Sequence, residues 1–138
     1  AQAFAYYNFD TTAGRMVYDS SAVHPKYFNN DTTFPDGFVT PDDSWHNHWR
    51  QGQNALLGWN QALPGQGSGA KSLGAELAGT NAFAQCQVKK VFRAVCLRDP
   101  VDATDHGQVE AITTSFQSGN FDLKQVFAET AGYCSQGL

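Results

Sequence analysis

The 138-residue sequence has no long apolar run, no cluster of basic residues and only 3 cysteines. No stretch approaches the roughly 20 consecutive apolar residues that cross a bilayer, so we expect no membrane span within it. Lys and Arg number 9 against 13 Asp and Glu, which gives a net charge of −4 without any run of like charges. An acidic chain of this kind is a poor partner for nucleic acid and for an anionic membrane.

The three cysteines lack the spacing of a metal site. Cys86, Cys96 and Cys134 include no C-x-x-C pair, and no histidine stands at zinc-ligand spacing from any of them. We therefore expect one disulfide and one leftover thiol, and with them a periplasmic or extracellular location. Three buried free thiols in a cytosolic protein are the alternative. The opening "AQAFAYY" is compatible with the residues that follow a removed targeting segment.

The composition of the chain changes near residue 41. The residues before it are rich in Asn, Asp, Thr, Gly and Pro, with short β-prone pieces such as "RMVYD" at 15–19 and "GFVT" at 37–40. We therefore predict an irregular arm with one small hairpin over 1–41, packed on a partner or a neighbouring domain. A helical domain is predicted over 42–138.

The segment after residue 41 has the signals of a helix start followed by a loop. "TPDDSW" supplies a proline and then capping residues within 42–44, and apolar residues recur as far as Leu57, which predicts a helix. "LPGQGSGAKS", residues 63–72, has several turn-type residues in quick succession and predicts a loop.

The last half of the chain is helical by pattern. Apolar residues recur at three- and four-residue steps in the segments 81–100, 102–119 and 120–134. The resulting stripes contain Ala84, Val88, Val91, Phe92, Val95, Val109, Ile112, Phe116, Leu123, Val126, Phe127 and Thr130. Asn81 and Asp102 are placed to cap helices, and Gly119 suits a left-handed closing position. Because the connections are short, we predict a mainly α fold that ends in an up-down-up three-helix bundle.

This bundle predicts which cysteines pair. In an up-down-up arrangement the first and third helices run parallel, so Cys96 and Cys134, each at a C-terminal end, lie at the same end. Cys86 is ten residues before Cys96, which at 1.5 Å per residue places it about 15 Å further down the helix. A disulfide tolerates only about 7 Å between Cα atoms. We therefore predict the pair Cys96–Cys134.

The segment "DDSWHNHWRQ", residues 42–51, gathers two tryptophans and two histidines. If it is extended, His46 and His48 point to one face and could share a metal; if it is helical, the two imidazoles point apart. The predicted helix favours the second arrangement, with Trp45 and Trp49 four residues apart in an aromatic ridge. We therefore expect structural or interface aromatics here, with His46 and His48 as the only candidate metal ligands.

The segment "GQGSGAKS", residues 65–72, matches the phosphate-binding loop G-x-x-x-x-G-K-[ST] except at Ala70, where glycine is expected. Such a loop follows a buried strand of an α/β sheet, whereas the residues before this one read "GWNQALP". We therefore expect a flexible Gly-rich hinge and no nucleotide site. No neighbouring base marks Cys86 as a nucleophile, so no catalytic residue is assigned.

Three segments carry a resemblance to a known family. "AFAYYNFDTTAGRMVYD", residues 3–19, resembles the start of the C-terminal domain of unknown function of planctomycete-type c-type cytochrome multi-domain exported proteins, in which G-F-A-x-E-N-F-D precedes a G-R step. "FAQCQVKKVFRAVCLRDPVDATD", residues 83–105, is similar to that domain's F-x-x-C helix and its L/G-R-x-P-x-x-x-D turn. "FDLKQVF", residues 121–127, follows in the family's order, whereas the middle of the chain is longer than in the family.

The resemblance implies a setting but no catalytic residues. In the family a C-x-x-C-H haem-attachment segment commonly lies just ahead of the N-F-D stretch, and this sequence contains none. We therefore expect no cofactor within this chain, and haem c in a partner or in an upstream segment. Only a structural signature carries over from the family to this sequence. It consists of Asn8, Phe9, Asp10, Gly14 and Arg15.

The leading hypothesis is a non-catalytic accessory or docking domain, exported and associated with a c-type cytochrome in an electron-transfer assembly. The opening "FAYYNF" holds many large apolar rings for a chain start, which suggests that a partner covers them. The expected interface residues are Phe4, Tyr6, Tyr7, Phe9, Trp45 and Trp49. The alternatives are a small metal- or cofactor-assisted redox enzyme that uses His46 and His48, and a structural subunit of an extracellular filament.

Overall fold

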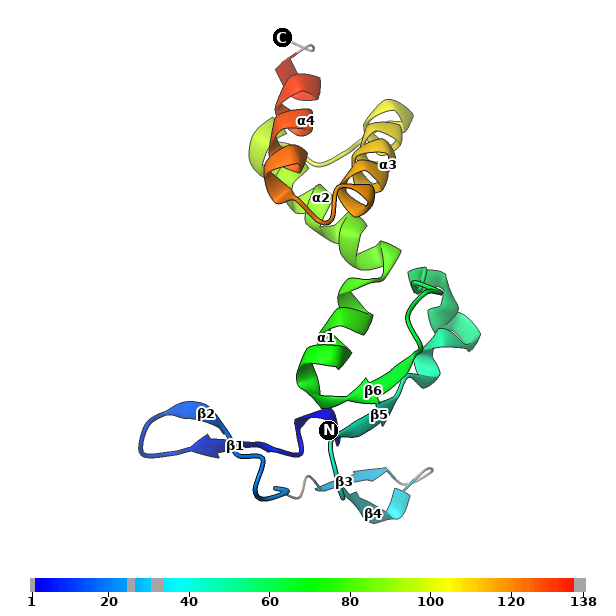
Figure 1. The fold of residues 1–138 in the computed structure, drawn as a ribbon. Coiled ribbons are helices and arrows are strands. Elements are labelled where there is room, and N and C mark those ends of the chain that lie inside the picture. The colour runs from blue at the N-terminus through cyan, green and yellow to red at the C-terminus, as the bar shows by residue number, and fades with distance from the viewer. Residues whose placement is uncertain (1, 25–26, 31–33, 136–138) are drawn as a thin grey trace. The chain divides into compact units, whose positions relative to one another are not determined.

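A computed structural model describes residues 2–24, 27–30 and 34–135 (Figure 1). The N-terminal half contains η1 (Gln2–Phe4), β1 (Tyr7–Asp10), β2 (Arg15–Tyr18), β3 (Tyr27–Asn30), β4 (Phe34–Val39), β5 (Ser44–His46), η2 (His48–Arg50), η3 (Gly52–Leu57) and β6 (Gln66–Ser68). The helices α1 (Gly69–Ala78), α2 (Asn81–Cys96), α3 (Ala103–Ser118) and α4 (Leu123–Ser135) follow. The predicted mainly α fold, with a small hairpin near its start, is confirmed. Within the described ranges no helix is long and apolar enough to cross a membrane.

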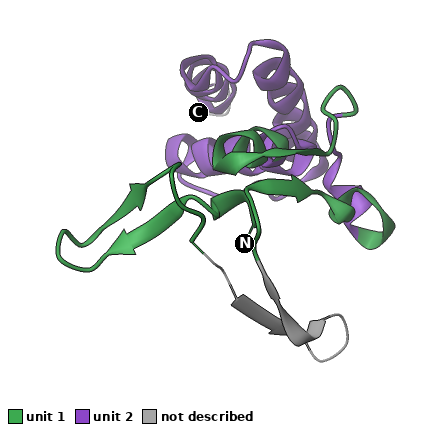
Figure 2. Ribbon diagram, turned by 60° about the horizontal axis from the view of Figure 1, so that its bottom comes forward, with its two compact units in different colours: residues 1–53, 61–76 green, residues 54–60, 77–138 purple. Residues whose placement is uncertain are grey.

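The chain forms two compact units (Figure 2). Unit 1 comprises residues 1–53 and 61–76, and unit 2 comprises residues 54–60 and 77–138. Residues on both sides of the 54–60 segment belong to unit 1 because β5 pairs with β6. The composition change near residue 41 therefore lies inside unit 1.

Unit 1 contains the two-stranded antiparallel sheets β1–β2, β3–β4 and β5–β6. In the β1–β2 hairpin Tyr7 lies opposite Tyr18, and Phe9 lies opposite Met16. Since alternate residues of a strand point to opposite faces, these four side chains share one face. We call this set of Tyr7, Phe9, Met16 and Tyr18 the hairpin face.

The helix predicted from Asp42 to Leu57 is wrong, and so is the aromatic ridge that depended on it. The strand β5 occupies residues 44–46, and the 3₁₀ helices η2 and η3 follow it. The carboxylate of Asp42 caps a turn instead of a helix, since it accepts hydrogen bonds from the backbone N–H and the hydroxyl of Ser44 at 2.9 and 2.6 Å. These hydrogen bonds, with that from Gln2, lower the pKa of Asp42.

The partner strand β6 determines the conformation of β5. Trp45 lies opposite Gly67, and a Cβ on that glycine would come 2.9 Å from Trp45 Cζ2, so the indole lies close against the glycine backbone. The Trp45 Nε1 donates a hydrogen bond to Ser72 Oγ at 2.9 Å. The flexible hinge predicted over 65–72 is therefore wrong: these residues form β6 and the first turn of α1.

A buried ion pair holds η2 against α1 within unit 1. Glu76 is 2% exposed, and its carboxylate accepts hydrogen bonds from Arg50 Nε at 2.7 Å and from Arg50 Nη2 at 3.0 Å. Asn47 Nδ2 donates to the same carboxylate at 2.8 Å. Hydrogen bonding to Arg50 is the largest cause of the lowered pKa of Glu76. The buried charge is thus both paired and hydrogen bonded, as burial of a carboxylate requires.

The helices α2, α3 and α4 pack together in unit 2 (Figure 1). Their apolar stripes meet in one core. Its buried members are Ala84, Val88, Val91, Phe92, Val109, Ile112, Phe116 and Val126. Thr130 is also buried, and its hydroxyl donates to the Val126 carbonyl at 2.7 Å. The stripe of α4 is narrower than predicted, because Leu123 and Phe127 remain 45% and 48% exposed.

Of the three capping residues predicted from the sequence, one caps its helix as expected and two do not. The carboxylate of Asp102 accepts a backbone N–H and caps α3, as predicted. The hydroxyl of Thr80 caps α2, whereas Asn81 is the first residue inside that helix. Gly119 has a φ of −82°, and the left-handed conformation falls on the two residues after it, Asn120 and Phe121.

The disulfide joins Cys96 to Cys134, with 5.5 Å between their Cα atoms. It links the C-terminal ends of α2 and α4, which is the pairing predicted from an up-down-up bundle. Cys86 is free and exposed. The bundle is therefore crosslinked at the end where its first and third helices finish.

Candidate functional site

The N-F-D and G-R motifs of the family resemblance lie on either side of the turn of the β1–β2 hairpin. Asp10 and Arg15 are its last opposed pair. The Asp10 carboxylate accepts the N–H groups of Thr12 and Ala13 at 2.9 and 3.1 Å. Gly14 has a φ of +64°, a left-handed conformation that glycine adopts without strain, and its N–H donates to the Asp10 carbonyl at 2.8 Å. The role of these residues in the structure is to close the hairpin.

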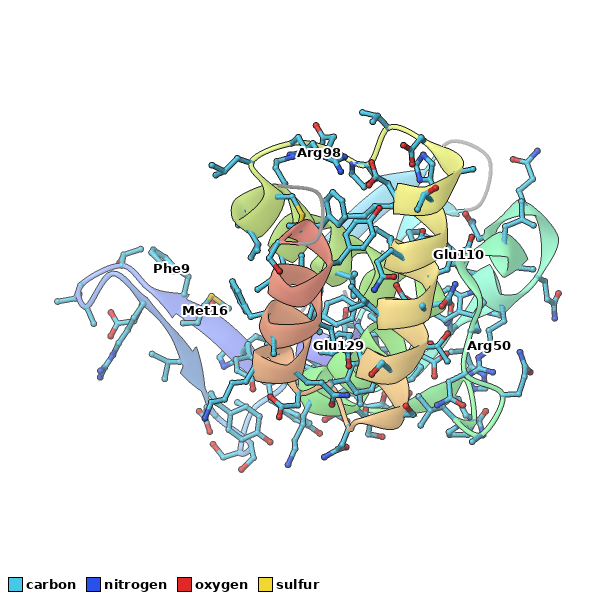
Figure 3. All side chains as sticks on the ribbon, turned by 90° about the horizontal axis from the view of Figure 1, so that it is seen from above. Phe9, Met16, Arg50, Arg98, Glu110 and Glu129 are labelled. Atoms are coloured by element: carbon cyan, nitrogen blue, oxygen red, sulfur yellow. A yellow bond between two sulfur atoms is a disulfide. The ribbon has the colours of Figure 1, made fainter. Side chains whose placement is uncertain are left out.

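The hairpin face is apolar and open. Phe9, Met16 and Tyr18 are 55%, 57% and 56% exposed. Figure 3 shows Phe9 and Met16 side by side on the hairpin, as their opposed positions in the register require. Single exposed apolar side chains are ordinary on a protein surface, whereas several on one face form a patch that marks an interaction site.

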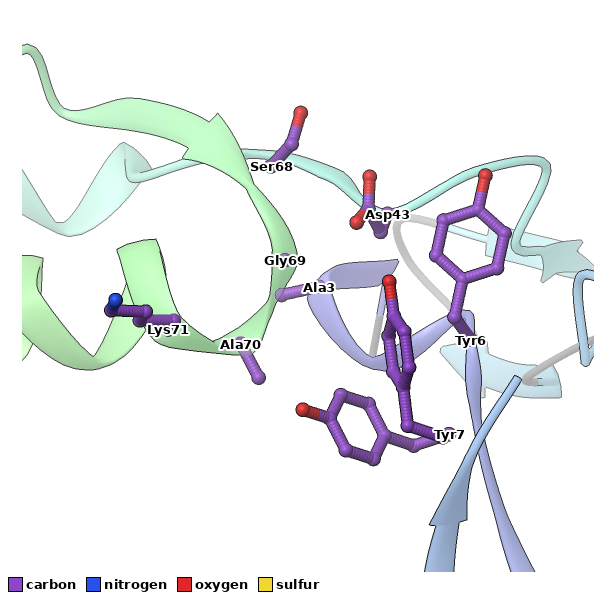
Figure 4. Close-up of a pocket in the computed structure, with 9 residues that line it drawn as sticks. Ala3, Tyr6, Tyr7, Asp43, Ser68, Gly69, Ala70 and Lys71 are labelled. Carbon is purple, nitrogen blue, oxygen red and sulfur yellow. The ribbon is translucent and has the colours of Figure 1, made fainter. Parts of the chain in front are cut away.

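Three tyrosines wall a cavity of about 260 Å³ at the open end of this hairpin (Figure 4). The ring of Tyr18 lies 5.0 Å from that of Tyr7 and 6.2 Å from that of Tyr6, centroid to centroid. The corresponding interplanar angles are 61° and 75°, so the rings meet edge to face and form a corner. The remaining lining comes from Ala3, Asp43, Ser68, Gly69, Ala70 and Lys71. We call this space the tyrosine cavity.

Asp43 places a carboxylate at the tyrosine cavity. Its backbone carbonyl accepts the N–H of Gly69 at 2.9 Å, which fixes the residue beside the first turn of α1. Among the residues that the structure describes, the carboxylate has no hydrogen-bond or ion-pair partner. Lys71 also lines the cavity, but its amine points away from the tyrosine rings (Figure 4). The cavity therefore combines aromatic walls with one negative charge.

The six aromatic residues predicted to form an interface divide into two sets. Three are exposed, namely Phe4, Phe9 and Trp49. Three are half-buried, namely Tyr6, Tyr7 and Trp45. The two half-buried tyrosines line the tyrosine cavity, whereas Trp45 packs on β6. Trp45 thus contributes to the fold of unit 1. Of the predicted residues, Tyr7 and Phe9 lie on the hairpin face, and Phe9 is the exposed one of the two.

The two candidate metal ligands lie next to each other. The rings of His46 and His48 are 6.3 Å apart between centroids and nearly parallel, at 22°. This is the arrangement expected of an extended segment, in which both imidazoles share a face. In the described part of the chain no group of three or more His, Cys, Asp and Glu side chains is placed to hold a metal ion. The pair alone supplies two ligands, fewer than a zinc site uses.

A charge cluster lies at the disulfide end of the bundle. Asp105 is 1% exposed, and its carboxylate accepts hydrogen bonds from Arg98 Nη2 at 2.9 Å and from the Val101 N–H at 3.0 Å. Hydrogen bonding to Arg98 is the largest cause that holds the pKa of Asp105 well below its usual range. The same guanidinium lies over the Phe92 ring, 5.4 Å from its centroid. Since these groups bind one another, the cluster stabilises the bundle.

Met16, Tyr18 and Asp43 were missed in the sequence. The first two lie in the piece "RMVYD" at 15–19, whose composition indicates a strand but not its partner. Pairing it with residues 7–10 would have placed both side chains on the hairpin face. Asp43 was assigned to a helix N-terminus, and that helix does not exist.

The sequence matches no family model, and comparisons with curated proteins and with solved structures give no match either. The family resemblance of residues 3–19, 83–105 and 121–127 therefore stays a prediction.

Proposed function

We propose that this chain is a non-catalytic docking domain whose hairpin face binds another protein. The observation that supports this function is the exposure of Phe9, Met16 and Tyr18 on one side of one hairpin. Aromatic residues and methionine are enriched in protein interfaces. Full burial of a Phe or Met side chain contributes about 1.5–3 kcal/mol, so covering the exposed half of each contributes roughly 1 kcal/mol.

The hairpin is tied at both ends, which favours binding. The turn is closed by the hydrogen bonds of Asp10 and Gly14. At the open end the N–H of Asp19 donates to the Tyr6 carbonyl at 2.9 Å, and the ring of Tyr18 contacts its neighbours. A surface that is already ordered loses less conformational entropy when a partner binds.

The partner we propose is a c-type cytochrome domain in an exported electron-transfer assembly. The family resemblance supports this partner, and the sequence itself has no C-x-x-C-H segment for covalent haem. The Cys96–Cys134 disulfide is compatible with a periplasmic or extracellular location. The net charge of −4 favours a partner with a basic docking surface, because complementary charge speeds association.

Site-specific photocrosslinking in the source cells tests this function. A photoreactive phenylalanine analogue replaces Phe9 in one variant and Leu56 in the control. Leu56 is 92% exposed but lies in η3, off the hairpin face. Crosslinked products are separated under denaturing conditions, stained for covalent haem and identified by mass spectrometry. We expect position 9 to give a haem-positive product that position 56 does not give.

The outcomes separate the two parts of the proposal. Equal crosslinking at both positions, or none at either, would overturn docking through the hairpin face. A specific product at position 9 that lacks covalent haem would support docking and overturn the cytochrome partner. The double variant Phe9→Asp/Met16→Asp is expected to lose the partner on co-purification, while Leu56→Asp retains it.

A further inference from the structure

The tyrosine cavity has a shape that suits a compact ligand group. Tyr18 meets Tyr7 at 61° and Tyr6 at 75°, so the three rings are walls of a corner and not a flat platform. A planar sugar or base stacks on one open ring face. A corner of rings instead contacts a round group from several sides, which is how aromatic cages hold ammonium cations.

The charge at the cavity favours a cation. The carboxylate of Asp43 is half-buried and, within the described residues, has no partner that neutralises it. The first turn of α1 lies beside it and carries a partial positive charge of about half an elementary charge. The full charge of the carboxylate is larger, so the sum is negative. Lys71 also lines the cavity, but its amine is directed away from the rings (Figure 4).

We propose that the tyrosine cavity binds an organic ammonium group, with Tyr6, Tyr7 and Tyr18 around the cation and Asp43 as its counter-charge. The volume of about 260 Å³ is close to the lower end of small-molecule sites and admits a group the size of a trimethylammonium head. Aromatic faces attract such cations through their negative charge density. The binding free energy of this contact is larger where water is excluded than at an exposed site. This site does not rest on the docking function proposed above.

The same chemistry has two sources, a free small cation or a methylated lysine of another protein. Choline represents the first source, and a short peptide with one trimethyllysine represents the second. Binding of both shows a site for the ammonium group alone. Tighter binding of either assigns the source.

A pair of ligands of equal shape isolates the role of charge. Choline and its neutral analogue 3,3-dimethyl-1-butanol are titrated into the intact chain at constant ionic strength, and backbone amide shifts are followed by NMR. We expect choline to shift the amides of Tyr6, Tyr18 and Ala70 and to bind about ten-fold more tightly than the neutral analogue. Equal affinities, or no shift with choline and with the trimethyllysine peptide, would overturn the proposal.

Variants of the lining separate ring, charge and fold. Tyr6→Leu and Asp43→Asn are each expected to weaken choline binding about ten-fold, whereas Tyr6→Phe keeps the ring and retains binding. Glu110→Gln is the matched control, since it removes the charge of an exposed carboxylate on α3 that does not line the cavity; its affinity should be unchanged. Retention of choline by both Tyr6→Leu and Asp43→Asn would contradict the site. An unchanged Trp emission spectrum, to which Trp45 and Trp49 of unit 1 and Trp59 of unit 2 contribute, shows that each variant is folded.

Discussion

Tyr133 on α4 donates its hydroxyl to the buried carboxylate of Asp105 on α3, with 2.8 Å between the oxygens. The contact joins two helices at the end of the bundle that also carries the disulfide. The pKa of Tyr133 is raised, mainly because its hydroxyl donates this hydrogen bond, and further by burial and by the negative charge of Asp105. The same carboxylate is held ionised by Arg98, which makes the bundle sensitive to acid.

Acid is expected to destabilise the bundle through Asp105. Its pKa is lower in the folded than in the unfolded state, so its stabilising contribution is complete above about pH 4 and is lost as the pH falls towards the folded value. Asp105→Asn should therefore lower the melting temperature at pH 7 and flatten its fall between pH 5 and pH 2. Far-UV circular dichroism measures both. The exposed Asp99→Asn variant should keep the wild-type pH dependence, and an equal flattening there would contradict this assignment.

Removing one partner of the buried Arg50–Glu76 ion pair should destabilise unit 1 more than replacing both partners. Arg50→Met leaves the Glu76 carboxylate buried without its cation and is expected to cost about 3–5 kcal/mol. Arg50→Met combined with Glu76→Leu should be more stable than the single variant, because the buried charge is gone. Urea unfolding followed by Trp emission gives the free energies. A double variant less stable than Arg50→Met would show that the carboxylate is stabilised by other donors, such as Asn47.

Two glycines that differ in their surroundings test the packing of Trp45. A Cβ at Gly67 would meet Trp45 Cζ2 and Ser72 Oγ at 2.9 Å, so Gly67→Ala should destabilise unit 1 by about 1–3 kcal/mol. Gly74 lies in α1 with nothing within 4 Å of its Cβ position, so Gly74→Ala should be neutral or stabilise by up to about 1 kcal/mol. Thermal unfolding and the Trp emission maximum report the difference. A neutral Gly67→Ala would mean that the indole does not rest on β6.

The disulfide should contribute strongly to stability, whereas the third cysteine should not. The bond closes a segment of 38 residues, for which restriction of the unfolded chain gives about 4 kcal/mol and measured values are typically about 2–4 kcal/mol. Cys134→Ser is expected to lose this amount in urea unfolding of unit 2. Cys86→Ser should change stability by less than about 0.5 kcal/mol, since the thiol is exposed. Equal losses in both variants would be inconsistent with the pairing.

The two histidines give a test of the redox-enzyme alternative. His46 and His48 share a face but have no third ligand among the described residues, so we expect any bound zinc or copper to be removed by dialysis against a chelator. Elemental analysis before and after dialysis, with His46→Ala as the comparison, measures this. Stoichiometric metal that survives dialysis and depends on His46 would favour the enzyme.

The C-terminal bundle could be predicted from sequence because its signals are local. The helices are determined by apolar periodicity within each segment, the start of α3 by its cap at Asp102, and the helix order by short loops. Each of these signals can be read from neighbouring residues. They sufficed to place Cys96 beside Cys134. Even there, Thr80 displaced Asn81 as the cap, since either residue suits the position.

The β5–β6 pair could not be predicted, because its cause is distant in the chain. Residues 44–46 and 66–68 carry no shared local signal, and the second strand is a Gly-rich piece with low β propensity. What pairs them is the fit of Trp45 onto Gly67 and its hydrogen bond to Ser72. The tyrosine cavity was missed for the same reason, since Asp43 reaches it only once that pair has formed.

The crosslink between α2 and α4 turns residues 96–134 into a covalent ring that contains all of α3. A protease that cuts one peptide bond inside this ring leaves both pieces attached, so the nicked chain keeps its intact mass plus one water until a reductant is added. In an oxidising environment a single cut within the ring therefore releases no fragment, and release requires a second cut or reduction of the disulfide.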